Sequence, residues 1–230
     1  MSPPARTEAK GRGRPAGAHT RKQAAKWTPD DRALMKADPK LGALMKELGP
    51  IHPDRDRRGS RPDPYTALAR AICGQQLSTK AAATIWGRIE ELFGGVPSPQ
   101  QVIDADPQSL RDAGLSWSKV TYFRDLAERV RDGELDLERL PQMGDADVIE
   151  ELTAIKGIGR WTAEMFLIFH LGRPDVLSTG DLGLRKGAQL AHGLEEAPTP
   201  AELDQMGEAW SPHRTLASLY LWRSLDNAPQ

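Results

Sequence analysis

Two glycines two residues apart mark a segment where the backbone itself could bind a charged group. Residues 155–163 join two predicted helices through the turn Lys156-Gly157-Ile158-Gly159-Arg160. Because glycine has no side chain, such a turn leaves backbone N–H groups open, and these groups can contact phosphate oxygens. The same spacing is also typical of an ordinary helical hairpin, where the glycines only satisfy the turn geometry. The residues alone leave both interpretations open.

A carboxylate follows about twenty residues later, in the segment Thr179-Gly180-Asp181-Leu182. Gly180 permits a close approach to the backbone, and Asp181 is expected to stand at the start of a helix that carries Leu184 and Leu190. An aspartate in this position often serves only as an N-cap. Asp181 by itself does not distinguish a functional carboxylate from a capping one.

The helices that must position these residues are marked by capping side chains. Serine or aspartate, in several cases followed by proline, predicts helix starts at Asp63-Pro64, Ser78, Ser98-Pro99, Asp106-Pro107, Ser116 and Asp145. Apolar residues recur at helical spacing behind these starts, and a further helix is expected from Arg160 to about Leu171. No segment from Trp27 onward alternates long enough for a strand. The sequence therefore predicts an all-α fold.

The composition excludes several kinds of site. Cys73 is the only cysteine, which excludes an internal disulfide, a cysteine-ligated zinc site and a four-cysteine iron–sulfur cluster. No stretch approaches the roughly 18 apolar residues that a membrane span needs, and the basic N-terminus lacks the apolar block of a signal peptide. We therefore expect a cytoplasmic protein with no membrane contact.

The formal net charge of -1 hides an asymmetry along the chain. Residues 1–26 hold seven basic side chains and one acid, a net charge of about +6, so the remainder carries about -7. This tail is predicted to be disordered. Its segment Lys10-Gly11-Arg12-Gly13-Arg14-Pro15 resembles an AT-hook for the minor groove, and the alternative is unspecific attraction to phosphate. The acidic body can still bind DNA if its basic groups gather on one face.

Together, the hairpin and the Gly-x-Asp segment resemble the helix-hairpin-helix, Gly/Pro-rich-loop, aspartate (HhH-GPD) superfamily of DNA glycosylases. The run from Gly157 to Ala163 is similar to the 3-methyladenine DNA glycosylase II branch. Ile72-Cys73-Gly74-Gln75-Gln76-Leu77-Ser78 resembles the wedge loop of that branch. The resemblance spans roughly Leu44 to Trp222. It implies a monofunctional DNA glycosylase that flips out alkylated, 3-methyladenine-type bases and excises them by hydrolysis in base excision repair.

The resemblance also assigns the chemistry. It makes Asp181 the catalytic carboxylate, which stabilises positive charge on the sugar as the base departs and orients or deprotonates the attacking water. Bifunctional relatives carry a lysine where this chain has Trp161, and an indole cannot form a Schiff base, so no strand cleavage is expected. Lys156 lies at a different place in the hairpin, where a phosphate contact or a solvated turn is expected.

Three positions are candidates for the base pocket. The resemblance places Trp161 in the pocket, and aromatic faces attract cationic alkylated bases. Trp117 is a second candidate, with a core role as the preferred alternative. The resemblance places His213 where the relative has a pocket tryptophan, and the loss of that ring would open the pocket. The alternative is that His213 is a surface turn residue. Trp222 and Tyr220 are expected to pack the C-terminal helix.

The remaining implied contacts concern the DNA backbone and the gap left by the flipped base. The wedge loop is expected at Gln75, Gln76 and Leu77, with Gln76 aligned to a position that is usually apolar. The DNA-binding hairpin is expected to use Gly157, Ile158, Gly159, Arg160 and Thr162. The backbone carbonyls of Thr153, Ile155 and Ile158 are implied to hold a structural Na⁺ or K⁺. No other cofactor is expected.

The implied architecture is two helical lobes with a DNA-binding cleft between them and no N-terminal α/β domain. One lobe is expected to comprise residues 65–172, with the wedge loop and the hairpin. The other comprises 27–64 plus 173–230 and carries Asp181. The expected partner is double-stranded DNA with damaged bases, bound by a monomer in the cytoplasm at the nucleoid. A glycosylase for oxidised, deaminated or mismatched bases and a non-catalytic DNA-binding protein stay open as alternatives.

Overall fold

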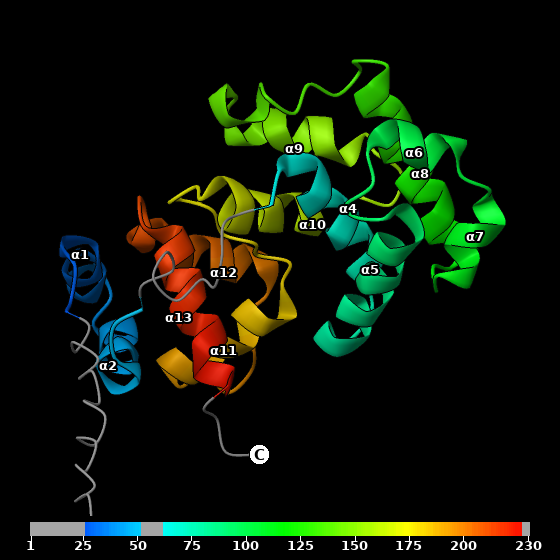
Figure 1. The fold of residues 1–230 in the computed structure, drawn as a ribbon. Coiled ribbons are helices and arrows are strands. Elements are labelled where there is room, and N and C mark those ends of the chain that lie inside the picture. The colour runs from blue at the N-terminus through cyan, green and yellow to red at the C-terminus, as the bar shows by residue number, and fades with distance from the viewer. Residues whose placement is uncertain (1–25, 52–61, 227–230) are drawn as a thin grey trace, which may run out of the picture.

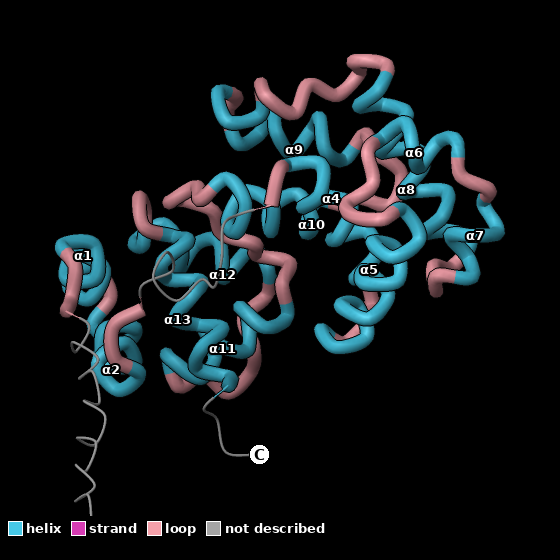
Figure 2. The backbone as a smooth tube through the Cα atoms, viewed as in Figure 1, coloured by secondary structure: helices cyan, strands magenta, loops and turns pink. Residues whose placement is uncertain are grey.

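The computed structural model describes residues 26–51 and 62–226, and every regular element within them is helical (Figures 1 and 2). In chain order these elements are α1 (Pro29–Ala37), α2 (Pro39–Leu48), α4 (Pro64–Gly74), α5 (Thr79–Phe93), α6 (Pro99–Asp104), α7 (Pro107–Asp112), α8 (Trp117–Arg131), the 3-10 helix η1 (Leu140–Gln142), α9 (Asp145–Thr153), α10 (Arg160–Met165), the π-helix η2 (Phe166–Leu171), α11 (Leu182–His192), α12 (Pro200–Gly207), the 3-10 helix η3 (Glu208–Trp210) and α13 (Arg214–Asp226). The all-α prediction is confirmed. Among these helices, none is long and apolar enough to cross a bilayer.

The basic tail predicted for residues 1–26, with the AT-hook-like segment from Lys10 to Pro15, lies outside the described residues except for Lys26.

Most helices begin where their capping residues predict. Side-chain oxygens accept hydrogen bonds from backbone N–H groups of the first turn at Asp63, Ser78, Ser98, Asp106 and Ser116. Asp145 is an exception, because it is the first residue of α9 and Gly144 takes the N-cap position without a side-chain bond. The Asp145 carboxylate instead pairs with Arg173 at 3.4 Å, so a contact distant in sequence replaces the predicted local one.

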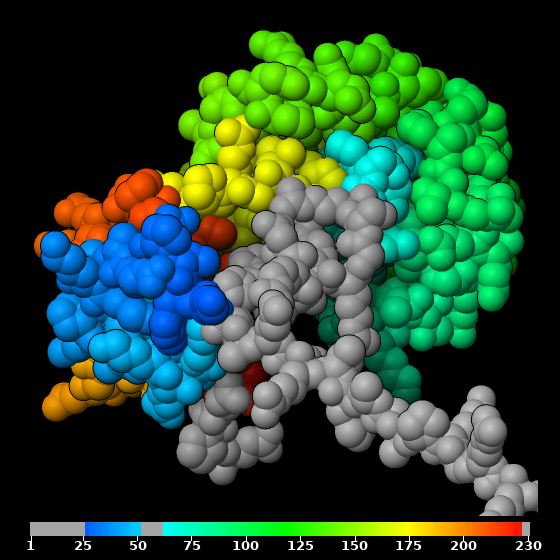
Figure 3. Space-filling view, turned by 60° about the vertical axis from the view of Figure 1, so that its left-hand side comes forward, coloured from blue at the N-terminus to red at the C-terminus, as the bar shows by residue number. Residues whose placement is uncertain are grey.

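The buried apolar side chains form two clusters. The larger one draws on residues between Tyr65 and Val176. The smaller one combines Leu34, Leu41 and Met45 with residues between Leu184 and Leu221. The first helices of the chain therefore pack against the last ones. Figure 3 shows the blue helices beside orange segments of the chain. Trp222 packs against both clusters, so the two clusters are in contact there. The lobe boundaries at 64 and 172 stay a prediction.

The helix predicted from Arg160 to about Leu171 is α-helical only as far as Met165 and continues as the π-helix η2. A π-helical turn is wider than an α-helical one, and it is frequent at functional sites. Within η2, Phe169 is 43% exposed, and its ring lies 5.7 Å from that of Trp222 on α13.

Asp38 joins α2 to the C-terminal part of the smaller cluster. Its Oδ2 accepts a hydrogen bond from Trp210 Nε1 at 2.8 Å and lies 2.8 Å from His192 Nε2, and its Oδ1 accepts from Leu41 N at 3.0 Å. Burial alone would raise the pKa of Asp38, but the hydrogen bonds from Leu41, Trp210 and His192 together hold its pKa below the ordinary value.

We expect Asp38→Asn to lower the free energy of unfolding at pH 7 by about 1.5 kcal/mol, because it removes hydrogen bonds to a partly buried carboxylate. The folded-state pKa of Asp38 lies below its unfolded value, so this stabilisation is complete above pH about 4 and is lost as the pH falls through the folded pKa. Urea unfolding at pH 7 and at pH 3 measures both effects. A difference between the two proteins that is the same at both pH values would contradict this account.

Candidate active site

The hairpin between α9 and α10 is held by a buried carboxylate on α8. Asp125 Oδ2 accepts a hydrogen bond from Lys156 N at 3.0 Å, and its Oδ1 lies 3.0 Å from Lys156 Nζ. Burial acts to raise the pKa of Asp125, but the bonds from Lys156 and Arg129 hold the pKa below its usual value. The Lys156 ammonium thus pairs with Asp125 at the base of the turn.

The two hairpin glycines have different surroundings. Gly157 has a φ of 81°, and a Cβ on it would lie 2.1 Å from Cδ2 of Tyr122, so this position accepts only glycine. Gly159 has a φ of -92°, which any residue adopts, and a Cβ there would have no atom within 4 Å. The fold therefore requires Gly157, whereas Gly159 leaves its side of the turn open to an approaching molecule.

The loop between α4 and α5 lies against this hairpin. Gln75 Nε2 donates a hydrogen bond to the Gly157 carbonyl at 2.7 Å. Lys119 Nζ donates to the carbonyls of Cys73 at 2.9 Å and Gln75 at 2.7 Å, and its burial there lowers the pKa of Lys119. Gln76 is exposed in a left-handed conformation with a φ of 57°. The side chain of Gln75 is thus anchored, while those of Gln76 and Leu77 are exposed.

Asp181 caps α11 and also faces the hairpin. Its Oδ1 accepts hydrogen bonds from Leu184 N at 2.7 Å and from Trp222 Nε1 at 3.0 Å. Its Oδ2 accepts one from Trp161 Nε1 at 2.7 Å. The capping role considered for Asp181 is therefore real, but one oxygen suffices for it. The second oxygen is directed to the half-exposed indole of Trp161.

A buried glutamate connects the loop before Asp181 to α10. Glu164 Oε2 accepts a hydrogen bond from Ser178 Oγ at 2.5 Å, and its Oε1 accepts from Arg160 Nε at 2.9 Å. The Ser178 carbonyl in turn accepts from Asp181 N at 2.9 Å. Glu164 therefore links the first turn of α10 to the loop that carries Asp181.

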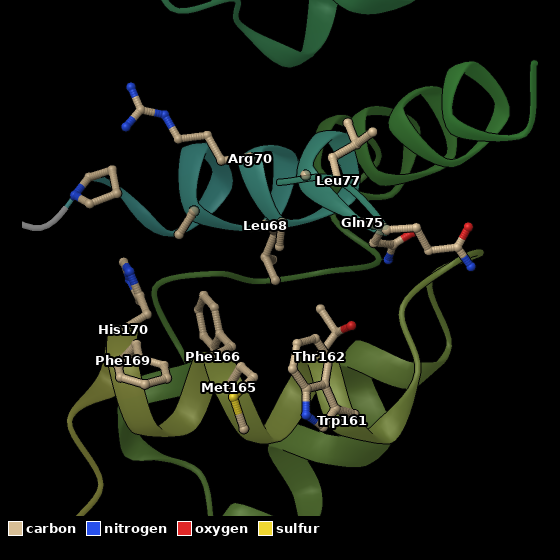
Figure 4. A pocket seen from close by; sticks show the side chains of 15 residues that line it. Leu68, Arg70, Gln75, Leu77, Trp161, Thr162, Met165, Phe166, Phe169 and His170 are labelled. Carbon is tan, nitrogen blue, oxygen red and sulfur yellow. The ribbon is translucent and has the colours of Figure 1, made fainter. Parts of the chain in front are cut away.

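A cavity of about 700 Å³ opens beside these groups, between α4 with its following loop and α10 with η2 (Figure 4). Its lining is mostly apolar and includes Leu68, Leu77, Trp161, Met165, Phe166 and Phe169. Trp161 lines the cavity and donates its N–H to Asp181 Oδ2, whereas Asp181 itself is not among the lining residues, so the carboxylate is linked to the cavity through this indole. A flat aromatic ring in this cavity would contact the indole that is bonded to Asp181.

The part of the chain that forms this site matches a known protein family. Residues 69–213 match the model of the HhH-GPD superfamily of base excision DNA repair proteins. The chain belongs to the HhH-GPD superfamily. This region contains the hairpin, the loop after α4 and Asp181.

Individual HhH-GPD relatives are similar over most of their length. DNA-3-methyladenine glycosylase 1 of Schizosaccharomyces pombe is 37% identical over 79% of this chain and 80% of its own length. The crystal structure of a DNA-3-methyladenine glycosidase from Bacillus halodurans superposes with a TM-score of 0.77 at 41% identity, covering 86% of this chain and 89% of that one. The 3-methyladenine DNA glycosylase Mag1 of S. pombe, solved with abasic DNA, gives a TM-score of 0.77 at 34% identity, covering 88% and 100%.

Two of the three pocket residues predicted for this HhH-GPD protein do not line the cavity. Trp117 is 55% exposed, so it is not a core residue either, and it lines a smaller hollow of about 310 Å³ together with Lys156. The Arg111 guanidinium lies over the Trp117 ring, 5.6 Å from its centroid. His213 precedes α13, where its N–H donates to the Trp210 carbonyl at 2.7 Å. Trp161 alone of the three lies at the cavity.

Trp222 is the site residue that sequence reasoning missed. We expected it only to pack the C-terminal helix, but its indole N–H also bonds to Asp181. Tyr220 is buried as expected, and its hydroxyl donates to Asp31 Oδ1 at 2.9 Å. No local pattern separates the two residues, because the bond from Trp222 depends on how α13 crosses α11.

Proposed function

We propose that this HhH-GPD protein is a monofunctional DNA glycosylase that excises alkylated, 3-methyladenine-type bases from double-stranded DNA in base excision repair. The observation that supports this most is the carboxylate of Asp181, which accepts hydrogen bonds from three N–H donors, one of them the indole of Trp161 that lines the apolar cavity. The relatives named as 3-methyladenine glycosylases, one of them solved with abasic DNA, support the lesion class and the partner.

Asp181 would act on the sugar rather than on the base. As the base departs with the electron pair of the glycosidic bond, positive charge grows at C1′, and a fixed carboxylate nearby stabilises it. Water then adds at C1′ and loses a proton, which leaves an abasic site. Oδ1 accepts two hydrogen bonds, from Leu184 N and Trp222 Nε1, whereas Oδ2 accepts one, from Trp161 Nε1, so Oδ2 is the oxygen that would face the sugar.

The cavity would hold the flipped base. A cationic alkylated purine stacks favourably on the π-face of Trp161, and the apolar lining offers few groups that would bind a normal base. The exposed side chains of Gln76 and Leu77 would fill the gap in the duplex, which offsets part of the lost stacking. Trp161 occupies the place of the lyase lysine, so base removal without strand cleavage is proposed.

The hairpin would bind the DNA backbone on one side of the lesion through N–H groups of the segment from Gly157 to Thr162, with Arg160 beside them. Carbonyls at the end of α9 carry the negative end of the helix dipole, which suits a cation. Thr153, Ile155 and Ile158 would therefore supply carbonyl oxygens to a Na⁺ or K⁺ that links the hairpin to a phosphate. We place the enzyme, as a monomer, in the cytoplasm with the nucleoid.

A panel of duplexes, each with one lesion, tests this function. Release of 7-methylguanine or 3-methyladenine is expected to exceed release of oxidised, deaminated or mismatched bases by about tenfold or more, a difference of about 1.4 kcal/mol in the barrier. Strands should break only after alkali cleaves the abasic product. Preferred release of an oxidised or mismatched base would assign a different lesion class. Binding without any release would leave a DNA-binding protein.

A further inference from the structure

The hydrogen bond from Trp222 to Asp181 joins two helices that lie far apart in the sequence. Trp222 is on α13, 41 residues after Asp181, and α13 packs alongside α11 (Figure 1). Its ring also stacks on Phe169 of η2, which lines the cavity. The indole is half-buried, so packing against both clusters limits its movement. Its N–H is therefore a fixed donor to one oxygen of the carboxylate.

Gly183 leaves the space through which this donor reaches Asp181. A Cβ on Gly183 would lie 2.9 Å from Asp181 Oδ1 and 3.2 Å from both Nε1 and Cδ1 of Trp222. Gly183 lies in the first turn of α11, where glycine is less favourable than alanine by up to about 1 kcal/mol. Its φ is not in the left-handed region, so the backbone does not require glycine here. Glycine is required here by the contact between the Asp181 carboxylate and the Trp222 indole.

We propose that Trp222 is a positioning residue for the catalytic carboxylate and that Gly183 is the glycine that makes this contact possible. This inference rests on the proposed function. Leu184 N and Trp222 Nε1 hold Oδ1 from two directions, so the carboxyl group cannot rotate about its Cβ–Cγ bond without losing both. Oδ2 then keeps its direction toward Trp161, the residue that lines the cavity.

Two substitutions remove the contact from opposite sides. Trp222→Phe keeps an aromatic ring on Phe169 but deletes the N–H donor. Gly183→Ala keeps the donor but places a methyl group against both Oδ1 and the indole, which forces the two apart. Each is expected to slow single-turnover release of 7-methylguanine about tenfold, as for the loss of one hydrogen bond to a charged group. The Kd for a duplex with a tetrahydrofuran abasic site should stay within about twofold, because the DNA contacts are unchanged.

The double variant should be only about as slow as each single one, because both remove the same interaction. Trp210→Phe is the matched control, since it also deletes an indole N–H bonded to an aspartate, Asp38, but in the smaller cluster. Its release rate should equal that of the unmodified protein at a temperature where both are folded.

The Asp181→Asn variant separates the two proposals. Full-rate release by Asp181→Asn would overturn the proposed function itself. Slow release by Asp181→Asn together with full-rate release by either Trp222→Phe or Gly183→Ala would overturn only the positioning role. The same holds if the loss of rate in these variants is matched by an equal loss of DNA affinity, or if their effects multiply in the double variant.

Discussion

Asp181→Asn is expected to lower single-turnover release of 7-methylguanine from a duplex by about a thousandfold, while DNA binding changes by less than about threefold. Removing a group that stabilises charge only in the transition state typically costs about 10²–10³ in rate. The amide retains an oxygen that accepts the cap bond from Leu184 N, and asparagine caps helices as well as aspartate does. The fold is therefore preserved while the negative charge is lost.

The measurement is the rate of abasic-site formation with enzyme in excess, together with the Kd for abasic duplex. Asp106→Asn is a matched control, because Asp106 also caps a helix, α7, through Gln108 N at 3.1 Å, whereas only Asp181 also accepts a bond from the cavity residue Trp161. It should release the base at the unmodified rate. If Asp181→Asn released the base as fast as this control, the carboxylate would be only a helix cap.

Alanine at the two hairpin glycines is expected to affect different properties, stability at Gly157 and DNA affinity at Gly159. Gly157→Ala should lower the free energy of unfolding by about 3 kcal/mol, of which about 1–2 comes from the left-handed backbone and the rest from overlap with Tyr122. Gly159→Ala should cost less than about 1 kcal/mol, because its φ is ordinary and its Cβ would meet open space. It should nevertheless weaken binding to abasic duplex about tenfold, because a methyl group separates the backbone N–H groups from the phosphate.

Urea unfolding and DNA-binding titrations of both variants provide the test. Adding Tyr122→Ala to Gly157→Ala should cost less stability than the sum of the two single changes, since the overlap is then gone. If the DNA affinity of Gly159→Ala were unchanged, the hairpin would not be part of the DNA-binding surface. Unchanged stability of Gly157→Ala would mean that Tyr122 moves aside freely.

The sequence by itself determined where most helices begin and that Asp181 caps the helix that follows it. A cap bond joins residues two or three positions apart, so its partners are visible in a short stretch of sequence. Asp63, Ser78 and Ser116 were predicted on this basis, and the structure has them as caps. The same locality explains why the glycine hairpin and its helices were predictable.

Only the tertiary structure decided which side chains surround the cavity. Trp117 and His213 do not line it, whereas Trp222 reaches Asp181 because α11 and α13 cross closely. That crossing depends on Gly187, where a Cβ would lie 2.5 Å from the Leu221 carbonyl oxygen. The distance between two helices is set by every residue packed between and around them, so no local pattern of residue types encodes it.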